Sequence, residues 1–320
     1  MPSNLIFWVL FVLFVLAMLA LDLGVFNRKA HVVHFKEAVG WTIVWVSLAG
    51  LFAVLLLQWG HLMTGDHSRP NSQLSLEFVT GYLIEESLSV DNLFVFLLIF
   101  RFFKVPSELQ HRVLFWGIIG ALVMRAVFIL AGVSLIHRFH WITYIFGAFL
   151  VYVGVRLFFQ KEDEQQMERS PLVRFFQKHM RLTKNYEGGK FWVMREGVRF
   201  FTPLMLVLLV VEASDVIFAT DSIPAILAIT QDAFVVFTSN VFAILGLRSL
   251  YFALAGMMKT FHLLHYGLSV ILTFIGIKML STHWFKIPTI AALGVIVGVL
   301  AISVAASLIF PPKAERRAAH

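Results

Sequence analysis

The sequence predicts an all-α membrane protein. Hydrophobic residues make up 59% of the 320 residues and charged residues only 14%, whereas soluble domains are closer to a quarter charged. Apolar runs of about 20 residues, the length needed to cross a hydrocarbon core about 30 Å thick, recur along almost the whole chain. A transmembrane β-barrel would instead show short segments of alternating polarity, and the sequence contains none.

We expect about nine transmembrane helices, joined by short loops and one long polar segment. The first apolar run has no basic residue before it and no clear cleavage site after it, so we interpret it as a retained span rather than a signal peptide. The expected spans cover residues 5–26, 38–59, 76–100, 113–136, 141–159, 203–229, 233–257, 263–280 and 287–310.

The Lys and Arg residues indicate how the chain is oriented. Most of them fall in loops that share one side of the membrane, including ten between Arg156 and Arg199. The positive-inside rule then places the N-terminus outside and the C-terminus in the cytoplasm. The net charge of +7 reflects this placement, and we expect no binding to nucleic acid. The absence of cysteine excludes disulfides, iron–sulfur clusters and thiolate metal sites.

Two of the expected spans carry several carboxylates. The span that includes residues 81–96 holds Glu85, Glu86 and Asp91, and the span that includes residues 206–225 holds three more acidic residues, Glu212, Asp215 and Asp221. An ionised carboxylate in hydrocarbon costs several kcal/mol unless it is paired, hydrated or bound to a cation. These groups therefore predict a cation site near the middle of the membrane.

The third to fifth spans resemble the sixth to eighth. A shift of 130 residues places Glu85 and Asp91 on Asp215 and Asp221, and a shift of 122 aligns the last span of each unit. Because each unit has three spans, the second copy must be inverted relative to the first. Secondary transporters often use inverted repeats and bind their substrate at the midplane, where the repeats meet. The alternative is that hydrophobic helices match one another by chance.

This repeat divides the chain into five parts. Two N-terminal spans precede the first repeat, a cytoplasmic polar loop separates the two repeats, and one span with a polar tail ends the chain. The parts are residues 1–75, 76–159, 160–200, 201–281 and 282–320.

The repeat also ranks the candidate ligands. The counterpart of Glu85 is the carboxylate Asp215, whereas the counterpart of Glu86 is Val216, so Glu85 ranks above Glu86. The first-rank metal ligands are Glu85, Asp91, Asp215 and Asp221. The second-rank ligands are Glu212, Glu86, Asn92, Ser222 and Asn240. Such hard oxygen donors suit Mn²⁺, Mg²⁺ or Ca²⁺.

Other interpretations of the same residues remain open. The carboxylates could be structural, paired with Arg125 and Arg248 in adjacent spans, or they could form a proton relay. Six residues turn a helix by about 600°, so Glu85 and Asp91 do not share a face. Either each carboxylate faces a different neighbour or the helix is interrupted between them. Pro224 supports an interruption in the sixth span more than in the third.

Enzyme function is not expected, because the sequence lacks the common nucleotide, hydrolase and metalloprotease motifs. The polar loop contains an amphipathic piece, residues 171–180. This piece could bind a partner, but it is also typical of a short helix that lies on an anionic membrane surface.

The two acidic stretches, GYLIEESLSVDNLFVF and VEASDVIFATDSIPA, resemble the signatures of the TerC family of integral membrane proteins. The resemblance continues through TSNVFAILGLRSLYFALAG and GLSVILTFIGIKML and covers the second to ninth spans. Within this family the chain is most similar to the Alx-like subgroup, and the family is related to LysE-type transporters. The resemblance implies a protein of the bacterial inner membrane that exports Mn²⁺ from the cytoplasm.

We therefore expect a divalent-cation carrier with Mn²⁺ as its substrate, no permanently bound cofactor and protons as a candidate coupling ion. The lipid bilayer is its other partner, and a homo-oligomer is compatible with the sequence. The alternative, from the older descriptions of the family, is a non-transporting scaffold for redox modulation or tellurium resistance that acts through the loop at residues 160–200.

Overall fold

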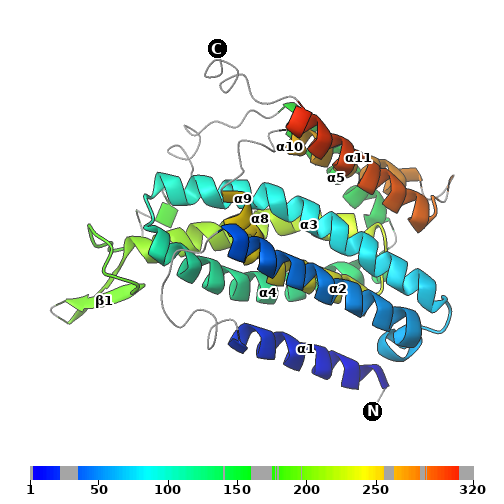
Figure 1. Cartoon of the computed structure of the whole chain (residues 1–320), viewed down its shortest axis with the longest axis horizontal. Coiled ribbons are helices and arrows are strands. Elements are labelled where there is room, and N and C mark those ends of the chain that lie inside the picture. Colours follow the sequence, from blue (N-terminus) through cyan, green and yellow to red (C-terminus); the bar gives the residue numbers. More distant parts are fainter. Residues whose placement is uncertain are drawn as a thin grey trace.

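The computed structural model describes most of the membrane region and part of the long loop (Figure 1). The described residues are 3–21, 35–139, 141–159, 175–176, 178, 180–195, 197–255, 263–281, 285 and 287–309.

Nine α-helices and one β-hairpin form within these described residues. The helices are α1 (Ser3–Leu21), α2 (Phe35–Thr64), α3 (Asn71–Phe102), α4 (Ser107–Arg138), α5 (Ile142–Phe159), α8 (Pro203–Leu227), α9 (Ala233–Ala255), α10 (Leu264–Leu280) and α11 (Thr289–Ile309). The hairpin pairs β1 (Trp192–Arg195) with β2 (Val198–Phe201) in antiparallel register.

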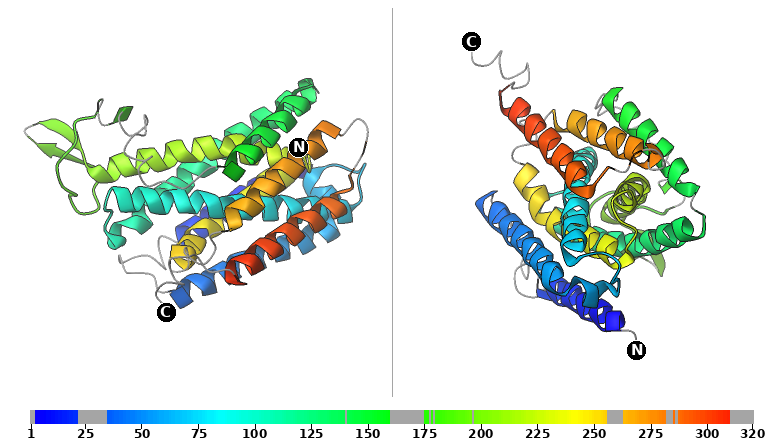
Figure 2. Two further views of the ribbon diagram at one scale, coloured as in Figure 1. Left: turned by 90° about the horizontal axis from the view of Figure 1, so that it is seen from above. Right: turned by 90° about the vertical axis from the view of Figure 1, so that its right-hand side faces the viewer.

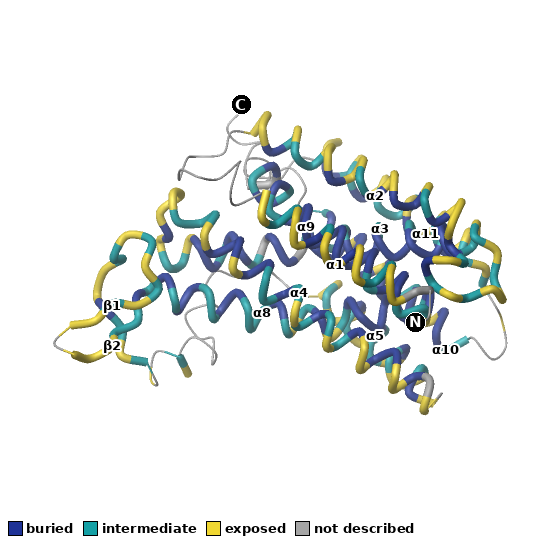
Figure 3. The backbone as a smooth tube through the Cα atoms, turned by 90° about the horizontal axis from the view of Figure 1, so that it is seen from below, coloured by how far each residue is buried: buried dark blue, intermediate teal, exposed yellow. Residues whose placement is uncertain are grey.

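The prediction of an all-α membrane protein is confirmed, because each expected span coincides with one of these helices. Six of the helices are long and apolar enough to cross a membrane, and α1 and α10 are shorter apolar helices. The remaining helix, α3, is 32 residues long and carries the first acidic stretch. The described parts of the outer helices α2 and α11 expose apolar side chains, as expected of surfaces that face lipid (Figure 3).

Of the two alternatives for the sixth span, the structure excludes an interrupted helix. Helix α8 runs without a break from Pro203 to Leu227 and contains Pro224. The last turns around Pro224 are fully buried, and tight packing against neighbouring helices allows a membrane helix to include proline. Asp215 and Asp221 therefore lie on one continuous helix and point in different directions.

Four helices form the centre of the bundle. Helix α3 packs against α8 and α9, and α4 packs against the same two helices, so that each repeat contributes two of the four. Helices α1 and α2 cover one side of this centre, and α5, α10 and α11 cover another (Figure 2). The acidic stretches of α3 and α8 are thereby enclosed by protein.

Contacts between the repeats are reciprocal, as a twofold relation between them requires. Helix α3 contacts α9 and α10, and its counterpart α8 contacts α4 and α5. A Cβ on Gly276 would lie only 2.7 Å from the carbonyl oxygen of Gly147. The shift of 122 turns this close approach into one between Gly154 and Ser269, and the Ser269 hydroxyl donates a hydrogen bond to the Gly154 carbonyl oxygen. The structure thus agrees with the inverted repeat.

The described part of the long loop packs on one end of the central helices. The Tyr186 hydroxyl donates a hydrogen bond of 2.8 Å to the carbonyl oxygen of Phe103, at the end of α3. Leu182 and Phe191 pack with it against the ends of α3, α4 and α8. The hairpin projects beyond this end of the bundle (Figure 1). The amphipathic piece at residues 171–180 lies largely outside the described residues.

An ion-pair cluster around Arg69, in the loop between α2 and α3, joins the two repeats. The guanidinium of Arg69 lies 2.7 Å from carboxylate oxygens of both Asp66 and Glu77. It also lies 3.4 Å from Asp232, in the loop between α8 and α9. One cation therefore links the start of α3 to the second repeat.

Candidate functional site

The site is built where the four central helices meet. Helix α3 supplies Glu85 and α8 supplies Asp215, so the two positions related by the repeat face the same interior. Helix α4 contributes Arg125 and α9 contributes Asn240. Each side chain comes from a different helix, and none of the four is more than 6% exposed.

Glu85, Arg125 and Asn240 form a closed ring of polar contacts. The Nη1 atom of Arg125 makes an ion pair with Oε1 of Glu85 and donates a hydrogen bond of 3.1 Å to Oδ1 of Asn240. The Nδ2 atom of Asn240 donates a hydrogen bond of 3.1 Å to Oε2 of Glu85. A buried charge is tolerated when it is paired and its remaining lone pairs are satisfied. The ring therefore supplies Glu85 with both a counter-charge and a hydrogen-bond donor.

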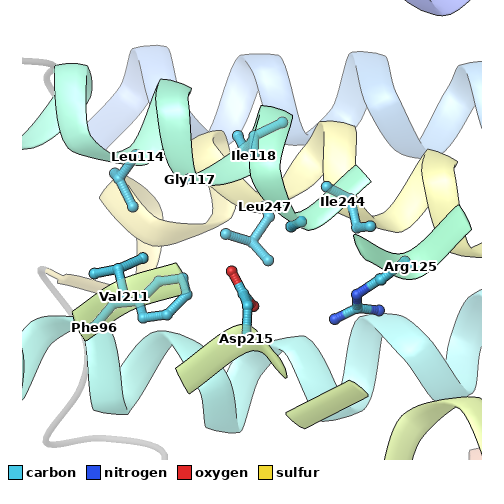
Figure 4. Close-up of a pocket in the computed structure, with 10 residues that line it drawn as sticks. Phe96, Leu114, Gly117, Ile118, Arg125, Val211, Asp215, Ile244 and Leu247 are labelled. Atoms are coloured by element: carbon cyan, nitrogen blue, oxygen red, sulfur yellow. The ribbon is translucent and has the colours of Figure 1, made fainter. Parts of the chain in front are cut away.

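Asp215 has a different environment from its counterpart Glu85. Its side chain lines a cavity of about 10 Å³ that Arg125 and Gly117 also line (Figure 4). The Oδ1 atom of Asp215 is buried and accepts no hydrogen bond from any described residue. A buried carboxylate oxygen without a donor is costly, so this atom is a candidate ligand for a cation or a proton.

Further polar groups of α8 lie near Asp215. Asp221 is half-buried, and its Oδ1 atom lacks a partner within the described structure; the same is true of the buried Ser222 hydroxyl. Asp215 and Asp221 are both close enough to Arg125 to interact with its charge. Glu212 lies one turn before Asp215 and places its carboxylate directly against α4, where a Cβ on Gly120 would be 2.0 Å from Oε1.

Glu86 points away from the ring of Glu85, Arg125 and Asn240. The side chains of successive helical residues point in directions about 100° apart. The half-buried Glu86 instead interacts electrostatically with the hydroxyl of Tyr82. Its Oε2 atom and the amide nitrogen of Asn92 are buried without a hydrogen-bond partner in the described parts of the chain. The lower rank given to Glu86 stays a prediction.

The side chain of Asp91 lies outside the described residues, so its role as a ligand stays a prediction. Arg248 on α9 is half-buried and has an interaction of its own. Of the two predicted charge partners, the structure pairs Arg125 with a candidate ligand. Among the residues that the structure describes, no three His, Asp or Glu side chains come close enough together to hold one metal ion.

Sequence reasoning missed two glycines and one serine of the site. Gly117 lines the cavity beside Asp215, and Gly120 makes room for Glu212. Gly117 and Ala121 are four positions apart on α4, the small-residue spacing typical of closely packed membrane helices, so this pattern could have been recognised. Ser89, one turn after Glu85, is fully buried with a hydroxyl that lacks a partner in the described structure.

The chemistry that this arrangement allows is the binding and release of a small cation. It combines carboxylates, one buried guanidinium and amide and hydroxyl oxygens, all enclosed by four helices. A cavity of about 10 Å³ holds about one water molecule, so this cavity has no room for an organic substrate.

Comparison with known proteins places the chain in a family. The model of the integral membrane protein TerC family matches residues 71–315, which include both acidic stretches and every helix of the two repeats. The chain belongs to the TerC family. No solved structure matches it.

Several relatives align over nearly the whole chain. An uncharacterised membrane protein of Myxococcus xanthus is 51% identical over 302 residues, which is 94% of this chain and 92% of the relative. The Alx proteins of Salmonella typhi and Escherichia coli K12 are each 48% identical over 297 residues, with 92% of both chains covered. The full name of those two relatives proposes a redox-modulating role at the membrane.

Proposed function

We propose that this protein is a carrier that exports divalent metal cations, with Mn²⁺ as the expected substrate. The observation that carries this proposal is the Oδ1 atom of Asp215, which is buried at the junction of the two repeats, has no partner in the described structure and faces a cavity. Nearby Asp221 adds a second carboxylate of the same helix. Together they balance the charge of one divalent ion while Arg125 balances Glu85.

The donor set supports a hard divalent ion. Carboxylate, hydroxyl and amide oxygens suit Mn²⁺, Mg²⁺ and Ca²⁺, and the chain has no cysteine to favour a softer metal. The resemblance of the acidic stretches to TerC-family signatures favours Mn²⁺ among these. Glu85 and Asp91 of α3 complete the four proposed first-rank ligands, so each repeat contributes two carboxylates.

The orientation of the chain and the chemistry of its carboxylates support a direction of transport and a driving force. The distribution of Lys and Arg supports an orientation with the N-terminus outside, and the resemblance to the TerC family implies the bacterial inner membrane. Carboxylates that release a cation can take up protons, so a proton gradient or the membrane potential would drive export. No nucleotide-binding motif occurs in the chain, which agrees with a carrier rather than a pump or an enzyme.

The test is export from cells that lack their own manganese exporter. We expect the wild-type protein to lower intracellular Mn²⁺ several-fold, and Asp215→Asn and Asp221→Asn each to abolish that effect. Measuring Mg²⁺ and Ca²⁺ in the same cells determines the substrate. The matched control is Glu108→Gln, a carboxylate exposed at the start of α4, which should export like the wild type.

Equal membrane levels of all variants, checked by immunoblotting, are required for the comparison. Normal Mn²⁺ export by both Asp215→Asn and Asp221→Asn would contradict the proposed site. Failure of the wild-type protein to change any of the three metal levels would contradict the carrier function itself.

A second candidate is a membrane scaffold for redox modulation or tellurium resistance. It is favoured by the names of the Alx relatives and by the projecting hairpin, on which Trp192 and Met194 are exposed. Such exposed apolar side chains can bind another protein. This function would be carried by the loop rather than by the membrane site.

Substitutions on the hairpin separate the two candidates. Replacing the whole loop would also remove Leu182 and Phe191, which pack against the helix ends. The double substitution Trp192→Ser and Met194→Ser leaves that packing in place. A carrier should keep metal export with these substitutions, whereas a scaffold should lose its stress phenotype and keep metal levels unchanged.

A further inference from the structure

The guanidinium of Arg125 lies at the centre of the proposed cation site. Arg125 is 2% exposed, and it contacts Glu85 of the first repeat and Asn240 of the second. It also lines the cavity into which Asp215 points (Figure 4). Arg125 therefore lies between the two carboxylates that the repeat relates to each other.

This guanidinium is held from one side only. Its Nη1 atom makes both contacts, while its Nε and Nη2 atoms are buried without a hydrogen-bond partner among the described residues. A structural Arg–carboxylate pair usually uses two parallel N–H groups, which gives it strength and a fixed geometry. The single-atom contact here leaves most of the donor capacity of Arg125 unused.

The two halves of the site are unequal. Arg125 and its counterpart Arg248 are 123 positions apart, and the same shift relates Asn240 to Gly117. Asn240 fills the space beside Glu85 and donates a hydrogen bond to it, whereas Gly117 leaves a cavity beside Asp215. One carboxylate of the related pair is therefore neutralised by protein groups, and the other is open.

A metal ion that reaches Asp215 would encounter the charge of Arg125. The cavity holds about one water molecule, so an ion in it would be close to the guanidinium of Arg125. Like charges that are close together repel strongly in a protein interior. The described carboxylates also do not converge on one point, and Arg125 lies between Glu85 and Asp215. An ion can use both Glu85 and Asp215 only after Arg125 has moved.

We propose that Arg125 is a tethered cation that occupies Glu85 while the carrier is unloaded and must be displaced when a divalent ion binds. This inference rests on the proposed function and adds a positioning residue to it. Return of Arg125 to Glu85 would then help to expel the ion. The competing explanation is that Arg125 is purely structural and holds Glu85 in place for the metal.

Binding of Mn²⁺ to the purified full-length protein distinguishes these explanations. If Arg125 competes with the ion, Arg125→Gln should bind Mn²⁺ at least tenfold more tightly than the wild type and export it more slowly. Arg125→Lys keeps the charge and should bind with nearly wild-type affinity. Electron paramagnetic resonance of free Mn²⁺ during a titration measures all three affinities directly.

Two further variants show whether Arg125 competes with Mn²⁺ even if Arg125→Gln does not fold. Glu85→Gln leaves the charge of Arg125 unpaired beside Asp215 and should weaken Mn²⁺ binding. The double variant Glu85→Gln with Arg125→Gln removes that charge without creating an unpaired one, and it should bind Mn²⁺ at least tenfold more tightly than Glu85→Gln alone.

The outcomes separate this inference from the function on which it rests. If the wild type binds Mn²⁺ but removal of the Arg125 charge weakens binding or leaves it unchanged in both backgrounds, Arg125 is structural and only this inference is overturned. If neither the wild type nor any variant binds Mn²⁺, the proposed function and the inference are both overturned.

Discussion

At the scale of single residues, the protein has two different kinds of ion pair, one around Arg125 and one around Arg69. Arg125 and Glu85 lie inside the membrane region and are paired, although burying such a pair costs about as much as it returns. Removing one partner would leave an isolated buried charge, which usually costs about 3–5 kcal/mol. Arg69, in the loop between α2 and α3, contacts three carboxylates and stays partly exposed. The first arrangement suits exchange of partners and the second suits a permanent link.

Asp66 allows the link at Arg69 to be tested by pH. The hydroxyl and backbone N–H of Ser68 both donate hydrogen bonds to Asp66, and with Arg69 they lower the pKa of Asp66 from 3.8 to about 2. A lowered pKa means that ionised Asp66 stabilises the fold above pH 3.8 and that this stability is lost as the pH falls towards about 2.

We therefore expect Asp66→Asn to lower the free energy of unfolding by about 1 kcal/mol at neutral pH, with the deficit shrinking between about pH 4 and pH 2. Thermal unfolding of the purified wild type and variant across this pH range measures the deficit in stability. Ser68→Ala, which removes one of the donors, should show a smaller deficit with the same pH dependence. A deficit that stays constant down to pH 2 would show that the charge of Asp66 is not responsible.

At the scale of helices, the pair α5 and α10 shows how the repeats are joined. Gly147 and Gly276 bring the two backbones together. The related positions Gly154 and Ser269 bring them together again about two helical turns away. Small residues let membrane helices approach closely, where van der Waals packing stabilises them. Because both contacts involve backbone atoms, neither can be relieved by turning a side chain.

Gly276→Ala should therefore destabilise the protein. The new Cβ would lie 2.7 Å from both the Gly147 carbonyl oxygen and the Val151 nitrogen, so the helices must separate, at a cost of about 1–3 kcal/mol. The matched control is Gly294→Ala on α11, where no atom lies within 4 Å of the added Cβ. Alanine favours a helix over glycine by up to about 1 kcal/mol, so the control should be neutral or stabilising.

Thermal unfolding in detergent compares the two glycine variants under identical conditions. A melting temperature for Gly276→Ala equal to or above that of Gly294→Ala would contradict the close approach of α5 and α10.

At the scale of the whole molecule, the bundle has two unlike ends. The described part of the long loop covers one end, where the hairpin projects past α3, α4 and α8 (Figure 1). The other end is tied together by Arg69 and its carboxylates. Helices α3 and α4 have 32 residues each, about 48 Å of helix, so both extend beyond a hydrocarbon core about 30 Å thick.

The absence of cysteine makes the orientation simple to measure. We expect Gln231→Cys, in the loop between α8 and α9, to react with a membrane-impermeant maleimide in intact spheroplasts. Asn185→Cys, in the basic loop, should react only after the membrane is broken. Both residues are exposed, and the positive-inside rule places them on opposite sides. The reverse pattern of labelling would invert the proposed direction of export.

Much of the fold could be predicted from the sequence alone. Hydrophobicity is a property of each segment, and every membrane helix must satisfy its own backbone hydrogen bonds. For this reason the expected spans match the helices, including α3, in which four carboxylates interrupt an otherwise apolar run. The identities of the intramembrane charges and the relation between Glu85 and Asp215 also follow from the sequence.

The partners of those charges were decided by the tertiary structure. A membrane helix surrounded by lipid and other helices is apolar on every side, so periodicity does not show which face meets which neighbour. The sequence offered Arg125 as a charge partner of the carboxylates, but its spacing did not indicate contacts with Glu85 and Asn240, which lie 40 and 115 positions away in the chain. Packing also decided that α8 is continuous at Pro224 and that a cavity lies between Asp215 and Gly117.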